Sequence, residues 1–396
     1  MRLTFSIDRH LGAVRLVLAT LAVAVLFTAC GAPGGGGGGP GAGLTGSAGS
    51  VKVALLLPIT ASGSTPAVAK ALKQAAELAL FDFDNPNVLL VPKDTRGTPD
   101  GARAAAQSAI QDGAELIIGP LFAQEVSGAA PVARQAGIPM IAFSTDEKVA
   151  GNGVYLLSFL AGRDVPRIVS FAMSRGKRNF AQLVPQSPYG RLAEASFAKA
   201  VSSGGGQAGV RATFPPDSNA MLGPVRQIAN AIKGGQQADA LFLPAGRDEL
   251  PSLAPLLASA ELTSGRVQFI GTGQWDYPNI GSERALIGGW YPAPDPKGWS
   301  KFTQSYAKTY GAAPPRLASL AYDAVSLAVS LSQNAPGQRY AMGQLTRSSG
   351  FAGVDGLFRL LPDGTCERGL AILEVREGGP QVIDPAPSSF ATASSY

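Results

Sequence analysis

From Val51 onward, short apolar runs alternate with longer stretches whose apolar residues recur every three or four positions. The runs VKVALLLP (51–58) and VLLVPKDT (88–95) are bounded by polar, Gly or Pro residues, which is typical of buried strands. Between them, residues 66–81 carry apolar side chains at helical spacing on one side only, which predicts a helix with one buried face. Repeated strand–helix order predicts a doubly wound parallel sheet, an α/β fold.

The stretch 112–145 continues this pattern and contains the first candidate site. Short apolar runs at 116–118 and 140–143 predict two strands, with a helix over 124–136 between them. Ser144 and Thr145 follow the second strand, and a loop over 119–124 follows the first. Ligands of open α/β sheets bind outside the carboxyl ends of strands, so both loops are candidate contacts. The alternative is that Ser144 and Thr145 only cap the next segment.

A second strand–helix set begins after about residue 163, and the pattern predicts two α/β lobes, with the chain returning to the first lobe near its end. Two helices, 299–310 and 317–332, follow that set, and a hairpin with its turn at Pro362-Asp363-Gly364 closes the chain. We expect lobe 1 to comprise 51–163 plus 285–368, lobe 2 to comprise 164–284 plus 369–383, and a loose tail over 384–396.

The first 29 residues are typical of a signal peptide. Arginines precede an apolar run over 16–29 that is shorter than the roughly 18 to 20 residues needed to span a bilayer. Phe27-Thr28-Ala29-Cys30 then resembles the lipobox of bacterial lipoproteins, in which the cysteine is acylated. A Gly-rich tether follows over 31–50. The sequence therefore predicts an extracytoplasmic protein anchored to a membrane through lipidated Cys30; the alternative is an ordinary secretory signal.

Composition argues against an enzyme. The single histidine, His10, lies in the predicted leader, and Cys366 is the only cysteine after Cys30. Without imidazole, the Ser-His-Asp and Cys-His arrangements and histidine metal sites are excluded, and Cys366 is expected to be a packing residue. Without the leader the net charge is about +3, too small and scattered for nucleic-acid binding. No cofactor and no metal are expected.

Several strings, taken in order, resemble type I periplasmic binding proteins, in particular the leucine/isoleucine/valine-binding group. They are VKVALLLP, DGAELIIGPL, YGRLAEASFAKAV, DALFLPAG, FIGTG, LAYDAVSLAV and GVDGLFRLLPDGTCERGLAILEV. The resemblance runs from Val51 to about Gly378. It implies two doubly wound parallel-sheet lobes joined by a hinge, which close on a small solute. VALLLPIT and LIIGPL also resemble the ligand-binding-fold domain of penicillin-binding protein activators.

The resemblance also implies a set of ligand contacts. They are Phe122, Ala123, Ser144 and Thr145 in the first lobe, and Tyr189, Gly246, Gln274 and Trp275 in the second. The loop 121–125 lacks the hydroxyls found in amino-acid binders, and neutral Gln274 stands where an acidic residue pairs with the ligand ammonium. A leucine-like zwitterion would leave buried charges underpaired. For Tyr189 and Trp275 the alternative to ligand contact is that the aromatic ring only packs against the rest of the protein.

Two functions therefore stay open at the level of sequence. The first is an extracytoplasmic solute-binding lipoprotein that closes on an amino-acid-like or cell-wall-derived ligand for an ABC transporter permease or a sensor. The second is a non-enzymatic lipoprotein that activates a penicillin-binding protein, a peptidoglycan synthase, through its surface. The lost amino-acid contacts favour the second function, and the two-lobe pattern favours the first.

Overall fold

The computed structural model describes residues 50–84 and 86–390. The predicted signal peptide, the lipidated Cys30 and most of the tether lie outside the described residues. Within the described part of the chain, no helix combines the length and the apolar character needed to cross a membrane.

The first lobe is built on a five-stranded, fully parallel sheet in the order β2-β1-β3-β4-β5. Its strands are β1 (Val51–Leu57), β2 (Val88–Asp94), β3 (Leu116–Ile118), β4 (Met140–Ala142) and β5 (Val154–Leu156). Its helices are α1 (Thr65–Phe81), α2 (Pro99–Gln111), α3 (Ala123–Gln135), α8 (Pro296–Tyr310), α9 (Ala318–Leu331) and α10 (Met342–Leu345). A small antiparallel sheet adds β11 (Phe351–Gly353), β12 (Gly356–Leu360) and β13 (Cys366–Arg368).

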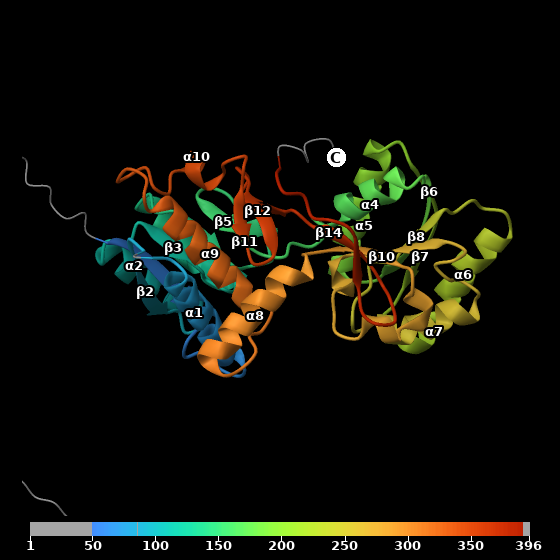
Figure 1. Ribbon diagram of the computed structural model, residues 1–396, viewed down its shortest axis with the longest axis horizontal. Coiled ribbons are helices and arrows are strands. Elements are labelled where there is room, and N and C mark those ends of the chain that lie inside the picture. The colour runs from blue at the N-terminus through green and yellow to red at the C-terminus, as the bar shows by residue number, and fades with distance from the viewer. Residues whose placement is uncertain (1–49, 85, 391–396) are drawn as a thin grey trace, which may run out of the picture. The chain divides into compact units, whose positions relative to one another are not determined.

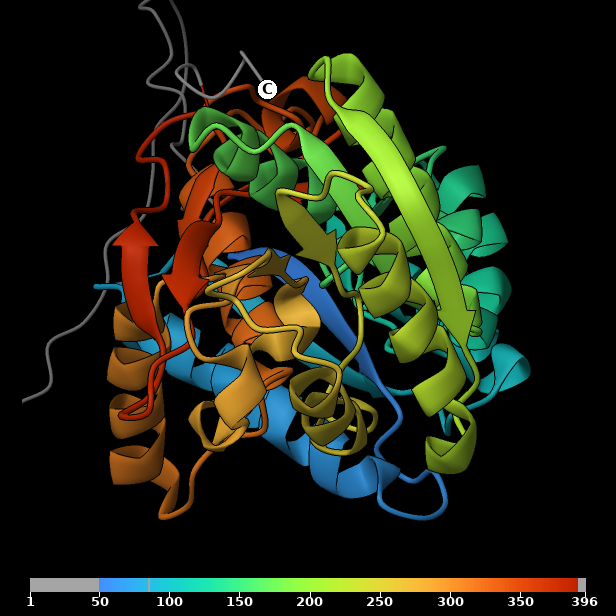
Figure 2. The same cartoon turned by 90° about the vertical axis from the view of Figure 1, so that its right-hand side faces the viewer.

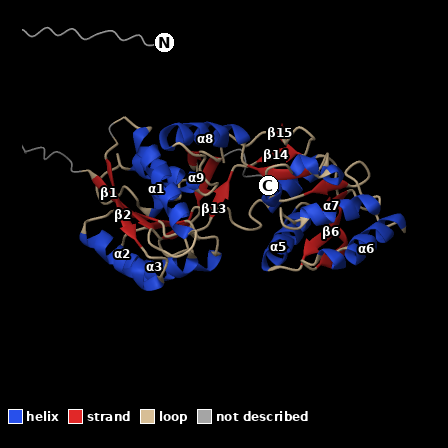
Figure 3. Cartoon of the chain, turned by 90° about the horizontal axis from the view of Figure 1, so that it is seen from below, coloured by secondary structure: helices blue, strands red, loops and turns tan. Residues whose placement is uncertain are grey.

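Helices cover both faces of the first sheet, as its apolar strands require. Figure 1 shows α9, from late in the chain, beside α1 from its start. Figure 3 shows α1 and α9 on one side of β1 and β2, with α2 and α3 on the other. Alanine lines the buried face of α1, for example at Ala69, Ala75 and Ala79. These small side chains let the helix approach the sheet closely. Strand β3 is covered on both faces, which is why its sequence LII has no polar residue.

The second lobe holds a seven-stranded sheet in the order β15-β14-β10-β9-β8-β6-β7. Its strands are β6 (Asn179–Pro185), β7 (Gln207–Phe214), β8 (Ala240–Phe242), β9 (Gln268–Ile270), β10 (Trp290–Ala293), β14 (Ala371–Glu374) and β15 (Gln381–Asp384). Its helices are α4 (Val165–Ser174), α5 (Pro188–Ser203), α6 (Leu222–Lys233) and α7 (Leu250–Ser259). Short 3-10 helices occupy Glu147–Val149, Ser218–Ala220, Gly273–Trp275, Ile280–Ser282 and Arg284–Leu286.

Figure 2 shows β14 and β15 in red at one edge of this sheet and β7 in light green at the other. β14 pairs antiparallel with both β10 and β15, whereas the rest of the sheet is parallel. The parallel α/β pattern predicted from sequence is therefore present, with an antiparallel edge added by the returning chain.

Two segments differ from the expectation for the lobes. Residues 285–293, expected in lobe 1, lie in the second lobe, because β10 pairs with β9 and β14 and buries Tyr291 completely. A four-residue strand next to glycines and prolines gives too short a run for the sequence pattern to detect. The expected loose tail is packed up to Phe390, whose ring is buried and lies 4.5 Å from the Arg359 guanidinium.

After β15 the chain returns to the first lobe, where Phe390 lies against Arg359. Three earlier segments of the described chain also cross between the lobes: residues 157–164, 294–295 and 369–370. The first joins β5 to α4, the second joins β10 to α8, and the third joins β13 to β14. We call them the crossing segments. Multiple crossings fix which faces of the lobes meet, and so they bring residues from distant parts of the sequence to one place.

Candidate functional site

A cavity of about 470 Å³ lies where the crossing segments meet the strand ends. Both lobes and all of the crossing segments contribute to its wall. The wall residues are Thr145, Ser158, Phe159, Leu160, Ala161, Gly162, Arg163, Asp164, Tyr189, Leu192, Gly273, Gln274, Asp276, Pro292, Ala293, Pro294, Arg316, Cys366, Arg368 and Leu370. The volume and the mixture of apolar and charged side chains suit a small-molecule site.

Tyr189, at the start of α5, anchors the second-lobe wall. Its hydroxyl donates a hydrogen bond to Thr272 Oγ1 at 2.6 Å, and the same oxygen accepts from the Gln274 backbone N–H at 3.4 Å. Thr272 is fully buried. Burial raises the pKa of Tyr189 above its ordinary value, so the phenol stays neutral. The ring is therefore held in one orientation along the cavity.

Two carboxylates, Asp164 and Asp276, make this wall acidic. Asp164 Oδ2 accepts a hydrogen bond from the Gly273 N–H at 2.5 Å, and burial raises the pKa of Asp164. Burial also raises the pKa of Asp276, while the positive charge of Arg316 partly opposes that shift. Arg316 belongs to the first lobe, so the first-lobe wall carries a guanidinium and the second-lobe wall carries two carboxyl groups.

The first-lobe wall contains alternating aromatic rings and guanidinium groups. The Arg316 guanidinium carbon lies 4.5 Å from the centre of the Trp299 ring and 5.3 Å from that of Phe159. The Arg368 carbon lies 4.5 Å from Phe159 on the same measure and 5.8 Å from Phe358. Phe159, from the first crossing segment, thus contacts two cations. Such contacts stabilise the desolvated charges and hold the crossing segment to the lobe.

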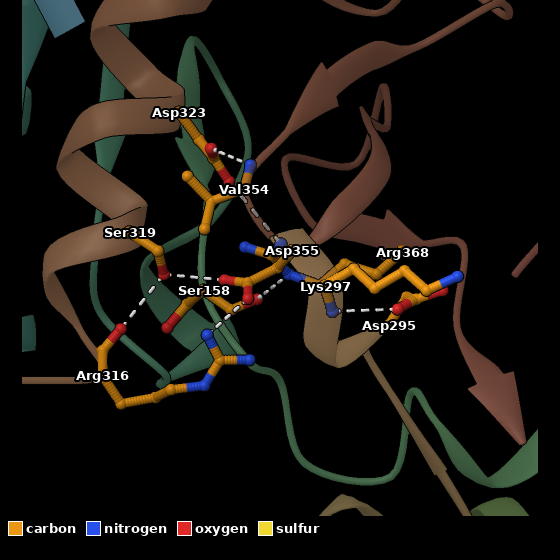
Figure 4. Close-up of polar contacts among 9 residues, drawn as sticks. All are labelled: Ser158, Asp295, Lys297, Arg316, Ser319, Asp323, Val354, Asp355 and Arg368. Atoms are coloured by element: carbon orange, nitrogen blue, oxygen red, sulfur yellow. Dashed lines mark hydrogen bonds and ion pairs between the residues drawn. The ribbon is translucent and has the colours of Figure 1, made fainter. Parts of the chain in front are cut away.

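Two buried aspartates balance these arginines, as Figure 4 shows. Asp355 accepts a hydrogen bond from Arg316 Nη1 and another from the Ser319 hydroxyl at 2.7 Å. Asp323 Oδ1 accepts from the Val354 N–H at 2.7 Å, and its Oδ2 lies 4.0 Å from Arg368 Nη1. Both carboxylates are fully buried. Asp323 therefore has a packing and capping role.

Burial raises the pKa of Asp323 to about 7, although Arg368 opposes the shift. Asp355 lies close enough to add a repulsion, and Arg316 a further attraction. Of these effects on the pKa of Asp323, desolvation by burial is the largest. The neutral acid is thus favoured in the folded chain over a range where the unfolded chain is ionised.

We therefore expect Asp323→Asn to gain stability relative to the native chain as the pH rises from about 4 to about 7. Asp323 titrates near 4 when unfolded and near 7 when folded. Its favourable contribution is complete below about pH 4 and is lost as the pH approaches 7, whereas asparagine does not titrate. Denaturant unfolding of both proteins at these pH values measures the change. If the difference in unfolding free energy between the two proteins stayed constant over this pH range, or if the variant lost stability relative to the native chain, Arg368 would be keeping Asp323 ionised.

Three of the eight contacts implied by the sequence line the cavity: Thr145, Tyr189 and Gln274. The others, Phe122, Ala123, Ser144, Gly246 and Trp275, are not among the wall residues. Ser144 is buried, and its hydroxyl oxygen accepts from the Asp146 N–H at 3.1 Å. Trp275 is fully buried and donates from Nε1 to the Leu243 carbonyl at 3.1 Å. Its position is that of a core residue.

Sequence reasoning missed the charged wall residues Arg316, Arg368 and Asp276, together with Phe159. Arg316 and Arg368 pack against Phe159 of the first crossing segment, and neither follows a parallel strand of the two large sheets. Arg316 follows Pro314 and Pro315 in a loop, and Arg368 ends a hairpin strand. Asp276 lies only two residues after Gln274, so the acidic group sought at that loop is present nearby. Cys366 is buried, with its Sγ 3.2 Å from the Ser158 carbonyl oxygen.

Comparison with known proteins gives a family for the chain. The family model described as "Periplasmic binding protein" matches residues 50–380. A search of curated proteins found no significant match. A putative branched-chain amino acid ABC transporter structure from Rhodospirillum rubrum is similar at 20% identity and a TM-score of 0.72, covering 84% of this chain and all of that one.

Two further solved structures are similar and have ligands in their titles. A solute binding protein of an ABC transporter from Rhodopseudomonas palustris, in complex with 3,4-dihydroxy benzoic acid, is 20% identical with a TM-score of 0.56, covering 85% of this chain and 96% of that one. A branched-chain amino acid transporter substrate binding protein from Streptococcus pneumoniae, in complex with isoleucine, is 18% identical with a TM-score of 0.54, covering 85% of this chain and all of that one.

These structural likenesses agree with the two-lobe α/β architecture, and the family model spans most of the chain. The chain therefore belongs to the periplasmic binding protein family, and is an extracytoplasmic protein that binds a small solute and is not an enzyme.

Proposed function

We propose that this protein captures a small solute in the cavity between its lobes and presents it to an ABC transporter. The observation that carries the proposal is the cavity itself, whose wall is built from both lobes and from the crossing segments. Similar structures are titled as solute-binding proteins of ABC transporters, which supports the transporter as partner.

The expected mechanism is a population shift. A solute that contacts both walls favours conformations in which the lobes lie close together, because it interacts with both only in those conformations. Thr145 of the first lobe and Tyr189 and Gln274 of the second are the proposed polar contacts predicted from sequence. All three line the cavity. The transporter would then recognise the solute-bound conformation.

The proposed ligand class is an amino-acid-like or aromatic acid. Isoleucine and 3,4-dihydroxy benzoic acid are named in the titles of similar structures. The cavity of about 470 Å³ accommodates molecules of this size. Its wall offers Phe159 and Leu160 for an apolar body, beside the charged groups.

Thermal unfolding of the purified protein against a ligand panel tests the proposal. The panel contains amino acids, benzoate and hydroxybenzoates, short peptides and peptidoglycan fragments. A ligand at about 100 times its dissociation constant should stabilise the fold by about 2.7 kcal/mol, which raises the unfolding midpoint measurably. A flat response from a protein that unfolds cooperatively would contradict solute binding. It would instead favour activation of a peptidoglycan synthase, which needs no solute.

A lipid anchor at Cys30 is proposed on sequence alone, because the residue lies outside the described part of the chain. The run Phe27-Thr28-Ala29-Cys30 after an apolar segment supports it. Metabolic labelling with a fatty acid in a bacterial host, compared between the native chain and Cys30→Ala, is the test. Label on both proteins, or on neither, would count against the anchor.

A further inference from the structure

We propose that the solute is a monocarboxylate with an apolar body, and that Arg316 binds its carboxylate. The inference rests on the proposed function, because it concerns the same cavity. None of the contacts implied by the sequence resemblance includes Arg316, and the first-lobe loop expected to hold a ligand carboxylate lacks its hydroxyls. An acid bound in this cavity therefore needs another positive or hydrogen-bonding group.

Of the three arginines in the cavity wall, one is paired with a carboxylate and one is buried. Arg163 binds both carboxylate oxygens of Glu147, at 3.2 and 2.7 Å. The Arg368 side chain is only 6% exposed, and its tip lies against the buried Asp323. Its Nε is 3.4 Å from the Ser158 carbonyl oxygen. Arg368 Nη1 and Nη2 have no hydrogen-bond partner within the described residues, but both atoms are buried. Arg163 is therefore paired and Arg368 is covered, so neither guanidinium presents an accessible hydrogen-bonding edge to a solute.

Arg316 differs in both exposure and bonding. Its side chain is 34% exposed, and it lines the cavity. Nη1 donates to Asp355, and Nε and Nη2 make no hydrogen bond within the described residues. Figure 4 shows the remainder of the guanidinium turned away from Asp355. Nε and Nη2 lie on one side of the planar group, so together they offer the two-pronged edge that fits a carboxylate.

The surroundings hold this edge in place before a ligand arrives. Asp355 fixes one end of the guanidinium and is itself held by the Ser319 hydroxyl. Trp299 and Phe159 pack against the group. A preorganised guanidinium loses little rotamer entropy on binding, so more of the interaction free energy remains as affinity. The raised pKa of Asp323 adds positive character to the cluster near neutral pH.

The opposite wall limits the solute to one negative charge. Asp164 and Asp276 line the second-lobe side of the cavity, and none of the described second-lobe wall residues is a lysine or arginine. A second carboxylate placed there would be buried without a cation to pair with. Apolar side chains, including Phe159, Leu160 and Leu192, fill much of the rest of the wall. The geometry thus favours an acid with its charge at one end and an apolar body between the walls.

Matched acid and amide pairs test the inference by titration calorimetry. The probes are benzoate, 3-methylbutanoate and isoleucine, each with its primary amide. For any pair that binds the native protein, we expect the acid to bind at least about tenfold more tightly, since its charge-assisted bonds to Arg316 are lost in the amide. Equal affinities for acid and amide would overturn the inference and leave the proposed function standing. No binding of any acid or amide would also overturn the inference, whereas the proposed function is overturned only by a flat response to the whole thermal-unfolding panel.

Two variants then assign the preference to Arg316. Arg316→Gln should reduce the preference for acid over amide to within about threefold, and Arg316→Lys should retain part of it because one charged donor remains. The preference is a ratio measured on the folded fraction, so lost stability from unpaired Asp355 does not imitate the effect. Arg163→Gln is the matched control, because Arg163 lines the same cavity but binds Glu147. An unchanged preference in Arg316→Gln, or an equal loss in Arg163→Gln, would refute the assignment.

Discussion

Trp275→Ala is expected to destabilise the second lobe by about 3 to 5 kcal/mol. Trp275 is fully buried, and Gly271 and Gly289 lie so close to its ring that a Cβ on either would clash with it. The substitution removes this ring from a space that two glycines have left for it, and the rigid backbone around it has little freedom to collapse. Denaturant unfolding followed by circular dichroism measures the change.

Trp275→Phe is the matched control for that experiment. It keeps an aromatic ring but loses the Nε1 hydrogen bond to the Leu243 carbonyl. Its cost should be clearly smaller than that of alanine. If alanine cost less than about 1 kcal/mol, the residue would not be a core element, and its predicted role as a ligand contact would regain support.

Ala161→Trp is expected to weaken solute binding by about ten- to a hundredfold with little loss of fold stability. Ala161 is half-buried on the first crossing segment and lines the cavity. An indole at this position fills space that the solute needs, and displacing it costs about 1 to 3 kcal/mol. Titration of the best panel ligand into both proteins measures the loss, and circular dichroism confirms that the variant is folded.

Ala123→Trp is the control, because Ala123 is another alanine with an exposure similar to that of Ala161. Ala123 begins α3 and is a ligand contact implied by the sequence resemblance, but it is not among the residues of the cavity wall. We expect its substitution to change affinity by less than about threefold, which lies within surface effects. The reverse result, a loss at Ala123 and none at Ala161, would move the site from the cavity to the end of β3.

The lobes were predictable because short-range patterns carry them. Buried parallel strands such as β1 and β3 are nearly continuous apolar runs, with Lys52 the one polar residue of β1, and amphipathic helices such as α1 separate them. Strand β10 was not predictable, because it spans four residues and its partners are β9 and β14. The pairing of β14 with β10 depends on the chain returning across the lobes late in the sequence, which no local pattern records.

The same distinction applies to the residues of the cavity wall: some are marked by local sequence patterns, and others are brought together only by the fold. Thr145, Tyr189 and Gln274 follow strand ends or begin helices, and the rule that ligands bind there finds them. Arg316 and Arg368 meet Phe159 only in three dimensions, across more than 150 residues of sequence. Asp355 accepts a hydrogen bond from Arg316, and Asp323 lies 4.0 Å from Arg368, so that these side chains form one cluster. Sequence spacing alone gives no sign of that cluster.

The most direct test of the central claim is a crystal structure of the protein grown with the panel ligand that raises the unfolding midpoint most. We expect the solute in the cavity, with its body beside Phe159 and Tyr189 and its carboxylate on Arg316. All three residues line that cavity. A solute bound elsewhere, with the cavity holding only water or closed by its own side chains, would contradict the assignment of this site.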